Sequence, residues 1–132
     1  MSSFEIRSHR AVDAVVAAAA SRGFAVAIAV VDASGILQEF RRMDGSVVGP
    51  VDVSQKKART AALFGMDGVD FAEVAKPGAA IYSIENTNGG LISFGGSVVL
   101  RDSGGGIVGG IGVAGATVDA DEELARIGTE AF

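Results

Sequence analysis

Residues 26–35 read Val-Ala-Ile-Ala-Val-Val-Asp-Ala-Ser-Gly. The six apolar residues that begin this stretch are typical of a strand covered on both faces. Asp32 to Gly35 have the chemistry of a turn, and residues 37–43 predict a second strand. Because a connection of about four residues can join only antiparallel neighbours, the two strands are predicted to form a hairpin.

Helices and a second hairpin are predicted on either side of this first one. Apolar spacing, helix-start residues and glycine breaks predict helices over 5–21 and about 52–64, one or two helical turns over 69–75, strands over 97–100 and 107–113, and a last helix that begins at a capping box, Asp119-x-x-Glu122. This order predicts an α+β fold in which helices flank a central antiparallel sheet. The chain length of 132 residues predicts a single domain, 1–132.

Composition limits the classes of partner. The formal charge of −5 argues against nucleic acids and anionic membranes, which attract basic surfaces. The absence of cysteine excludes disulfides, thiolate nucleophiles and iron–sulfur ligation. Charged residues precede any apolar stretch at the N-terminus, and residues 11–20 are too few to span a bilayer. We therefore expect a cytoplasmic protein with no membrane partner.

The glycine-rich segment 104–115 allows two interpretations. Gly110, Gly112 and Gly115 match G-x-G-x-x-G, the spacing of a dinucleotide site. Only 17 residues of the 132 follow Gly115, too few for the helix and further strand that such a site needs. We therefore interpret the segment as a hairpin tip and a slim strand, against which a helix, a neighbouring subunit or a flat ligand packs closely.

Chemically active side chains are predicted at two places. Arg42, Met43 and Asp44 lie at the end of the second strand, where a guanidinium could hold an anion. The alternative is an ordinary ion pair at the strand end, with Met43 in the core. Lys56 and Thr60 share one face of the next helix and, with Arg42, could line a pocket. The catalytic candidates are Arg42, Asp44, Lys56 and Glu85, and the ligand-binding candidates are Met43, Thr60, Tyr82, Gly95 and Gly96.

Metal and nucleophile chemistry have little support. His9 is the only histidine and lies at a helix start, so neither a histidine pair for a metal nor a convincing Ser-His-Asp triad is present. The loop aspartates lack the spacing of a calcium-binding loop and are interpreted as turn formers or helix caps. No metal site is predicted.

Five sequence blocks, taken in order, resemble a known family. They are Val26 to Gly35, Arg42-Met-Asp-Gly45, Lys56-Lys-Ala-Arg-Thr-Ala61, Phe94-Gly-Gly96 and Val108 to Gly115 followed by Asp119 and Asp121. The family is the haem-degrading and haem-binding domain family, also called GlcG/HbpS-like or DUF336, which includes the C-terminal domain of PduO-type proteins. The resemblance runs from about Ala11 to Phe132.

The resemblance implies a profilin-like sandwich that self-associates as a dimer or larger ring, and it makes haem a possible cofactor, since some relatives bind haem or a corrinoid. Two positions depart from the family pattern: Ile36 stands where a histidine is common, and Ala114 where a serine is usual. An axial iron ligand would then come from His9, Met43, Tyr82 or Thr60.

Three functions follow as hypotheses. The first is a small-ligand-binding protein, for haem or another tetrapyrrole, in a small-molecule metabolic cluster. The second is a cofactor-independent isomerase or lyase, in which Arg42 or Lys56 holds the substrate and Asp44 or Glu85 moves a proton. The third is an oligomeric accessory protein without catalysis.

Overall fold

The structure is a computed structural model that describes residues 2–132, and it contains one four-stranded antiparallel sheet. The strands are β1 (Ala27–Asp32), β2 (Leu37–Arg42), β3 (Ser97–Arg101) and β4 (Ile107–Ala114), in the spatial order β2-β1-β4-β3. Both predicted hairpins are present, and β1 pairs with β4 to join them. The predicted α+β class with a central antiparallel sheet is confirmed.

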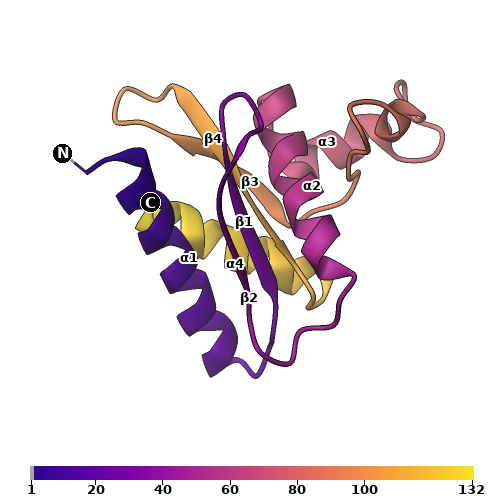
Figure 1. Ribbon diagram of the computed structural model, residues 1–132. Helices are drawn as coiled ribbons and strands as arrows, with labels where there is room; N and C mark the ends of the chain where they lie inside the picture. The colour runs from indigo at the N-terminus through magenta and orange to yellow at the C-terminus, as the bar shows by residue number, and fades with distance from the viewer. Residues whose placement is uncertain (1) are drawn as a thin grey trace.

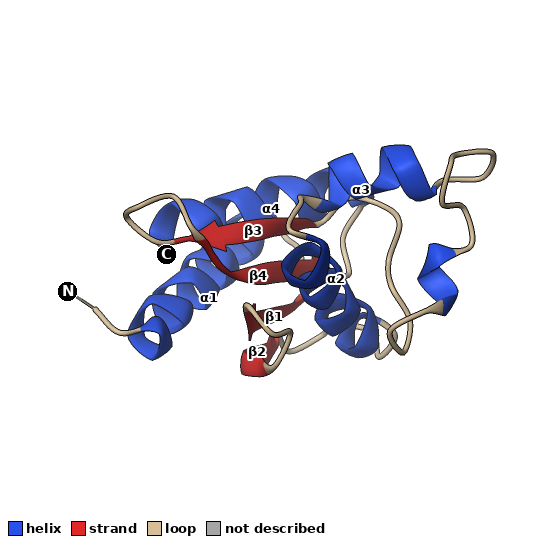
Figure 2. Cartoon of the chain, turned by 90° about the horizontal axis from the view of Figure 1, so that it is seen from above, coloured by secondary structure: helices blue, strands red, loops and turns tan. Residues whose placement is uncertain are grey.

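Helices cover both faces of this sheet (Figures 1 and 2). They are α1 (Phe4–Ser21), α2 (Pro50–Phe64), α3 (Gly68–Ala75) and α4 (Val118–Ala131), with a short 3-10 helix, η1 (Ile84–Asn86), in the loop before β3. Helices α1 and α4 pack together on one face, and α2 lies on the other (Figure 2). No helix within residues 2–132 is long and apolar enough to cross a membrane.

The core is divided by the sheet into two layers. The larger cluster lies under α1 and α4 and includes Val12, Val15, Ile28, Ile111 and Leu124, all fully buried. A smaller cluster lies under α2 and is made mostly of alanines and valine. Burial of such side chains contributes about 25 cal/mol for each Å² removed from water, which makes these layers the main source of stability.

The glycines of β4 let α2 lie directly against the sheet. A Cβ atom added to Gly110 would come within 2.6 Å of the carbonyl oxygen of Ala58, and one on Gly112 would overlap the carbonyl oxygen of Ser54. Neither glycine needs an unusual backbone conformation, so close packing is the reason for both. The slim strand predicted from the glycine run is present, and the element that packs against it is a helix of the same chain.

Two predicted helix starts are wrong in detail. Thr117, not Asp119, caps α4, and its hydroxyl accepts from the amide of Ala120. Glu122 of the expected capping box instead accepts from the amide of Gly96, before β3. Helix α2 begins at Pro50, whose fixed φ suits the first helical position, and Asp52 forms an ion pair with Lys56 within that helix.

Candidate functional site

A buried ion pair joins α2 to α4. Lys57 Nζ donates to Asp121 Oδ2 at 3.2 Å and to the backbone oxygen of Val113 at 2.8 Å. Asp121 Oδ1 accepts from the amide of Ala116 at 3.0 Å. The Phe94 ring lies 5.1 Å from Lys57 Nζ, within the range of a cation–π contact. The lysine side chain is only 1% exposed.

Burial shifts the pKa values of both residues of this pair. Desolvation lowers the pKa of Lys57 below its ordinary value of 10.5, although the carboxylates of Asp121 and Glu122 act in the opposite direction. Desolvation also raises the pKa of Asp121 above 3.8, against the opposing effect of Lys57 and of the backbone amides. The pair's hydrogen bonds link α2, the end of β4 and α4, so its evident role is to lock these elements together.

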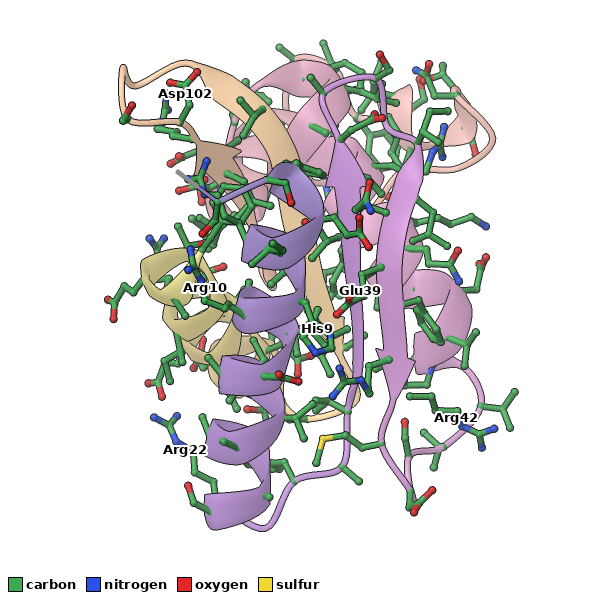
Figure 3. All side chains as sticks on the ribbon, turned by 60° about the vertical axis from the view of Figure 1, so that its left-hand side comes forward. His9, Arg10, Arg22, Glu39, Arg42 and Asp102 are labelled. Carbon is green, nitrogen blue, oxygen red and sulfur yellow. The ribbon has the colours of Figure 1, made fainter. Side chains whose placement is uncertain are left out.

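The first predicted group lies at the end of β2. Arg42 is exposed and its guanidinium donates to the backbone oxygen of Ser46 at 3.1 Å. Met43 packs against the larger core cluster, and Asp44 is exposed in the turn that follows. Figure 3 shows Arg42 at the end of β2 remote from the hairpin turn. The packing of Met43 matches the alternative in which it belongs to the core.

The second predicted group lies around α2 and the loop that precedes β3. Lys56 packs against Gly90, and Thr60, which is fully buried, accepts from the amide of Ile92 at 3.0 Å. Glu85 accepts a hydrogen bond from Ser93, and Tyr82 is largely exposed. Lys56, Thr60 and the loop are thus brought together. Within residues 2–132, no hydrogen bond or ion pair joins Arg42 or Asp44 to Lys56 or Glu85.

Gly95 and Gly96 lie inside the fold beside the buried pair. A Cβ atom on Gly96 would come within 2.5 Å of Lys57 Nζ, and the φ of Gly96 is +119°. One on Gly95 would approach Val69 to 3.0 Å and Glu122 Oε1 to 3.3 Å. Protein groups therefore take the close approach that was predicted for a ligand.

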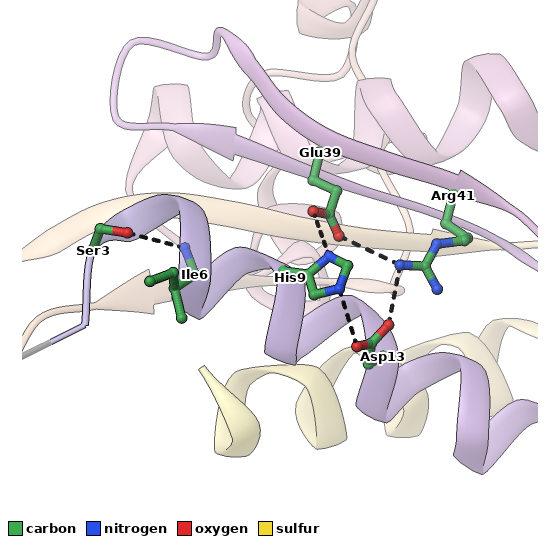
Figure 4. Close-up of polar contacts among 6 residues, drawn as sticks. All are labelled: Ser3, Ile6, His9, Asp13, Glu39 and Arg41. Atoms are coloured by element: carbon green, nitrogen blue, oxygen red, sulfur yellow. Dashed lines mark hydrogen bonds and ion pairs between the residues drawn. The ribbon is translucent and has the colours of Figure 1, made fainter.

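A separate polar cluster surrounds the only histidine (Figure 4). His9 Nδ1 lies 3.1 Å from Glu39 Oε1 on β2, and His9 Nε2 lies 3.3 Å from Asp13 Oδ2, one helical turn further along α1. Arg41 Nη2 lies 3.0 Å from Asp13 Oδ1 and 3.8 Å from Glu39 Oε2. These four residues, His9, Asp13, Glu39 and Arg41, form a closed ring of contacts, called here the His9 ring.

The His9 ring lies at the wall of a hollow lined by residues of α1 and β2. The hollow has a volume of about 310 Å³ and is lined by Glu5, Ile6, His9, Arg10 and Glu39. Figure 3 shows His9 and Glu39 facing one another, with Arg10 on the other side of α1. Ile6, which is 54% exposed, gives the hollow an apolar surface beside an imidazole.

A larger hollow differs in its chemistry. It has a volume of about 460 Å³ and lies between the start of α1, the β1–β2 turn and the start of β4, where it is lined by Phe4, Arg7, Asp32, Ala33, Ser34, Ile107 and Val108. None of these side chains is an imidazole, thioether, thiolate or phenol. Of the two hollows, only the one beside His9 offers a good iron ligand.

Sequence reasoning missed the partners in both clusters. His9 and Asp13 stand at i and i+4 of a predicted helix, which places them on one face. Lys57 is three residues after Ser54 and four before Ala61, and both of these residues are buried. Helical spacing therefore places Lys57 on the buried face of α2, unlike Lys56. Nothing local signals that Glu39 would meet His9, because a hydrogen bond between α1 and β2 depends on the tertiary fold.

No group of three or more His, Cys, Asp or Glu side chains within residues 2–132 is arranged to hold a metal ion. In the His9 ring the two carboxylates approach opposite sides of the imidazole, so they cannot share one cation with it. Each ring nitrogen of the imidazole instead contacts one carboxylate, and the ring lies beside a hollow that includes Ile6 and Arg10.

The fold and the two hollows define the class of protein. It is an α+β domain with helices on both faces of a four-stranded antiparallel sheet and with hollows of ligand size. The model of the family described as haem degrading protein HbpS-like matches residues 7–130. The chain belongs to this family.

Two proteins are similar to this chain in sequence. An uncharacterized 15.0 kDa protein from the dhaT-dhaS intergenic region of Citrobacter freundii is 34% identical over 110 residues, which cover 81% of this chain and 75% of the relative. The corrinoid adenosyltransferase PduO of Salmonella typhimurium is 33% identical over 103 residues, 76% of this chain. This chain spans only 30% of that enzyme's length.

Solved structures share the whole fold. A PduOC:haem complex has a TM-score of 0.90 at 28% identity, and the match covers all of this chain and 94% of the other. The Klebsiella pneumoniae protein ORFY, of family DUF336, has a TM-score of 0.92 at 28% identity, covering 98% and 89% of the two chains. A double mutant of Streptomyces reticuli HbpS has a TM-score of 0.90, also at 28% identity, covering 100% and 88%.

Proposed function

We propose that this chain binds haem, or a related planar tetrapyrrole, in the hollow beside His9. The observation that carries the proposal is the position of the only imidazole of the chain at the wall of a hollow that also includes Ile6 and Arg10, with one ring nitrogen held by Glu39. A carboxylate that holds one nitrogen of a ligating histidine orients the ring and increases its basicity. The family resemblance and the fold shared with a PduOC:haem complex support this ligand class.

The residues around the hollow fit the parts of such a ligand. His9 would hold the iron through Nε2 in place of its contact with Asp13, and Ile6 would lie against the apolar macrocycle. The exposed guanidinium of Arg10 donates to the Ser2 hydroxyl at 3.3 Å and could pair with a propionate instead. When bound, the tetrapyrrole would supply a redox-active metal, and the protein residues would hold and orient it.

The size of the hollow implies that one chain covers only part of the macrocycle. Drug-sized ligands are usually buried over most of their surface, in sites of about 300–1,000 Å³. A volume of about 310 Å³ is at the lower end of this range. We therefore include self-association in the proposal, with a second copy covering the exposed side of the ligand.

Haem titration tests the proposal. The purified chain should give a sharp Soret band with equimolar haem, and His9→Ala should lose the band shift while its circular dichroism is unchanged. Met43→Ala and Tyr82→Phe, which alter two of the other three predicted ligands, should bind as the unmodified chain does. Binding that survives His9→Ala, or no spectral change in the unmodified chain, would show that the proposal is wrong.

A further inference from the structure

Strand β2 forms one edge of the sheet, and no other strand within residues 2–132 pairs with its outer side (Figure 2). The amide of Met43 donates to the backbone oxygen of Val26 at 3.0 Å, which continues the ladder between β1 and β2. Because an antiparallel ladder bonds every second residue inwards, Glu39 and Arg41 also bond to β1, whereas Phe40 directs its amide and carbonyl away from the sheet. The outer edge of β2 therefore offers backbone donors and acceptors to another strand.

The usual protections of an edge strand leave most of β2 open. Edge strands are commonly shielded by a bulge or by charged side chains. Here the register shift with β1 confines the irregularity to Gln38, so residues 39–42 pair regularly. Two charges on this regular part, Glu39 and Arg41, have opposite signs and lie on one face of the sheet, two positions apart. A strand that carries the complementary charges in the opposite order would therefore be attracted to β2.

A second copy of β2, antiparallel and centred on Phe40, carries its charges in the required order. Each Phe40 then faces Phe40 of the other copy, and their outward amides and carbonyls form two hydrogen bonds. Glu39 of each copy lies opposite Arg41 of the other. Arg42 lies opposite the neutral Gln38. The nearest alternative registers in which outward backbone groups still meet place Glu39 opposite Glu39 or Arg41 opposite Arg41. Charge therefore selects the register centred on Phe40.

Exposed apolar side chains flank β2 at both ends. Ile36 is 64% exposed just before the strand, and Val47 and Val48 are 68% and 71% exposed in the loop after it. These are the three most exposed large apolar side chains in the described part of the chain. In an antiparallel pair the start of each β2 lies beside the end of the other, which brings Ile36 towards this loop of the second copy at both ends of the contact. Apolar surface gathered in this way is typical of a protein interaction site.

We infer that two copies of this chain join through β2, in the register centred on Phe40, so that their four-stranded sheets form one sheet of eight strands. The same surface is used on both copies, as a two-fold dimer requires. The order of the charges on Glu39 and Arg41 fits a second copy of this strand, whereas a strand of an unrelated protein would have to carry the same order by chance. The contact needs no ligand, so it does not depend on the proposed function.

Sedimentation of the purified chain without haem tests the contact. The unmodified chain should form a dimer or another even-numbered assembly. Phe40→Pro removes the outward amide but no bond to β1, and proline is tolerated at such edge positions. The matched control is Phe40→Ala, which loses the same packing under α2 and keeps the amide. Because two hydrogen bonds are lost, the Kd for self-association should be about 10- to 100-fold higher in the proline variant than in the alanine variant. A monomeric unmodified chain, or equal Kd values for the two variants, would overturn the inference.

Exchange of the charges tests the register. In a dimer of Arg41→Glu chains like charges would face each other at both cross-strand pairs, and the same holds for Glu39→Arg. A mixture of the two variants restores opposite charges at both pairs, without restoring any contact within either chain. The mixed dimer should therefore form about tenfold more tightly than a dimer of either variant alone, as native mass spectrometry can measure. Because each chain carries the same internal changes alone and in the mixture, only a contact between copies can cause the gain. No gain on mixing would overturn this register.

Discussion

Lys57 Nζ and Asp121 Oδ2 lie 3.2 Å apart in the interior and tie α2 to the first turns of α4. Each ion depends on the other, because an isolated charge in the core is strongly destabilising. Lys57→Met should lower the free energy of unfolding by about 3–5 kcal/mol, because it also removes the donor to the Val113 oxygen. Asp121→Asn should lower it by less, because burial already favours a neutral group at this position. The double variant should lose less than the sum of the two. Urea unfolding of the four proteins gives the coupling; simple additivity would contradict the mutual dependence of the two ions.

The same pair should give stability an unusual dependence on pH. Burial raises the pKa of Asp121 above 3.8. The stability that this carboxyl contributes is therefore fully present below pH 3.8 and is lost as the pH rises through the folded-state pKa. Burial lowers the pKa of Lys57 below 10.5. The stability that this amine contributes is therefore fully present above pH 10.5 and is lost as the pH falls through the folded-state pKa.

The difference in unfolding free energy between the unmodified chain and the Lys57→Met/Asp121→Asn variant isolates these two groups. We expect this difference to be smallest at intermediate pH and to rise towards both acid and alkaline pH. Urea unfolding at a series of pH values measures it. A difference that is largest at neutral pH would show that attraction, not desolvation, governs the pair.

The sequence predicted those parts of the fold whose signals are local. The apolar run 26–31 and the turn at Gly35 specify the first hairpin, and no distant residue is needed to recognise it. The start of α4 was placed wrongly because Asp119, Asp121 and Glu122 are all acceptable near a helix start, and the fold uses two of them elsewhere. Choosing Thr117 as the cap requires knowing that Asp121 meets Lys57.

The candidate site depends even more on tertiary contacts. His9 was recognised as the only imidazole, and Asp13 lies at helical spacing from it. Glu39 and Arg41 join them only because β2 passes beside α1. Residues on separate elements carry no joint signal in a single sequence, so the ring could not be predicted.

The close packing of α2 on β4 predicts a strong effect at one glycine. In Gly112→Ala the new methyl group would overlap the carbonyl oxygen of Ser54 and approach the amide nitrogen of Ala58 to 2.6 Å. Both are backbone atoms, so the helix itself must move. We expect a loss of about 1–3 kcal/mol or more in the free energy of unfolding. Thermal and urea unfolding measure it.

Gly104→Ala is the matched control for that variant. Gly104 lies in the β3–β4 turn, where the new methyl group would have only an ordinary contact with Asp102 at 3.5 Å. Its effect should stay within about 0.5 kcal/mol. If the two variants were equally stable, the glycines of β4 would not be required by the packing of α2.

Loss of the Thr60 hydroxyl should loosen the loop before β3. Its hydroxyl donates to the backbone oxygen of Lys56 at 2.7 Å and accepts from the amide of Ile92 at 3.0 Å, so it attaches the loop to α2. Thr60→Val keeps the shape of the side chain but leaves the Ile92 amide without a partner, which should cost about 1–3 kcal/mol. Hydrogen exchange should become faster at the Ile92 amide, while the amides of β1 keep their protection relative to global unfolding. Thr60→Ser retains the hydroxyl and should protect Ile92 as threonine does. Equal exchange at Ile92 in the valine and serine variants would mean that packing, not the hydroxyl, holds the loop.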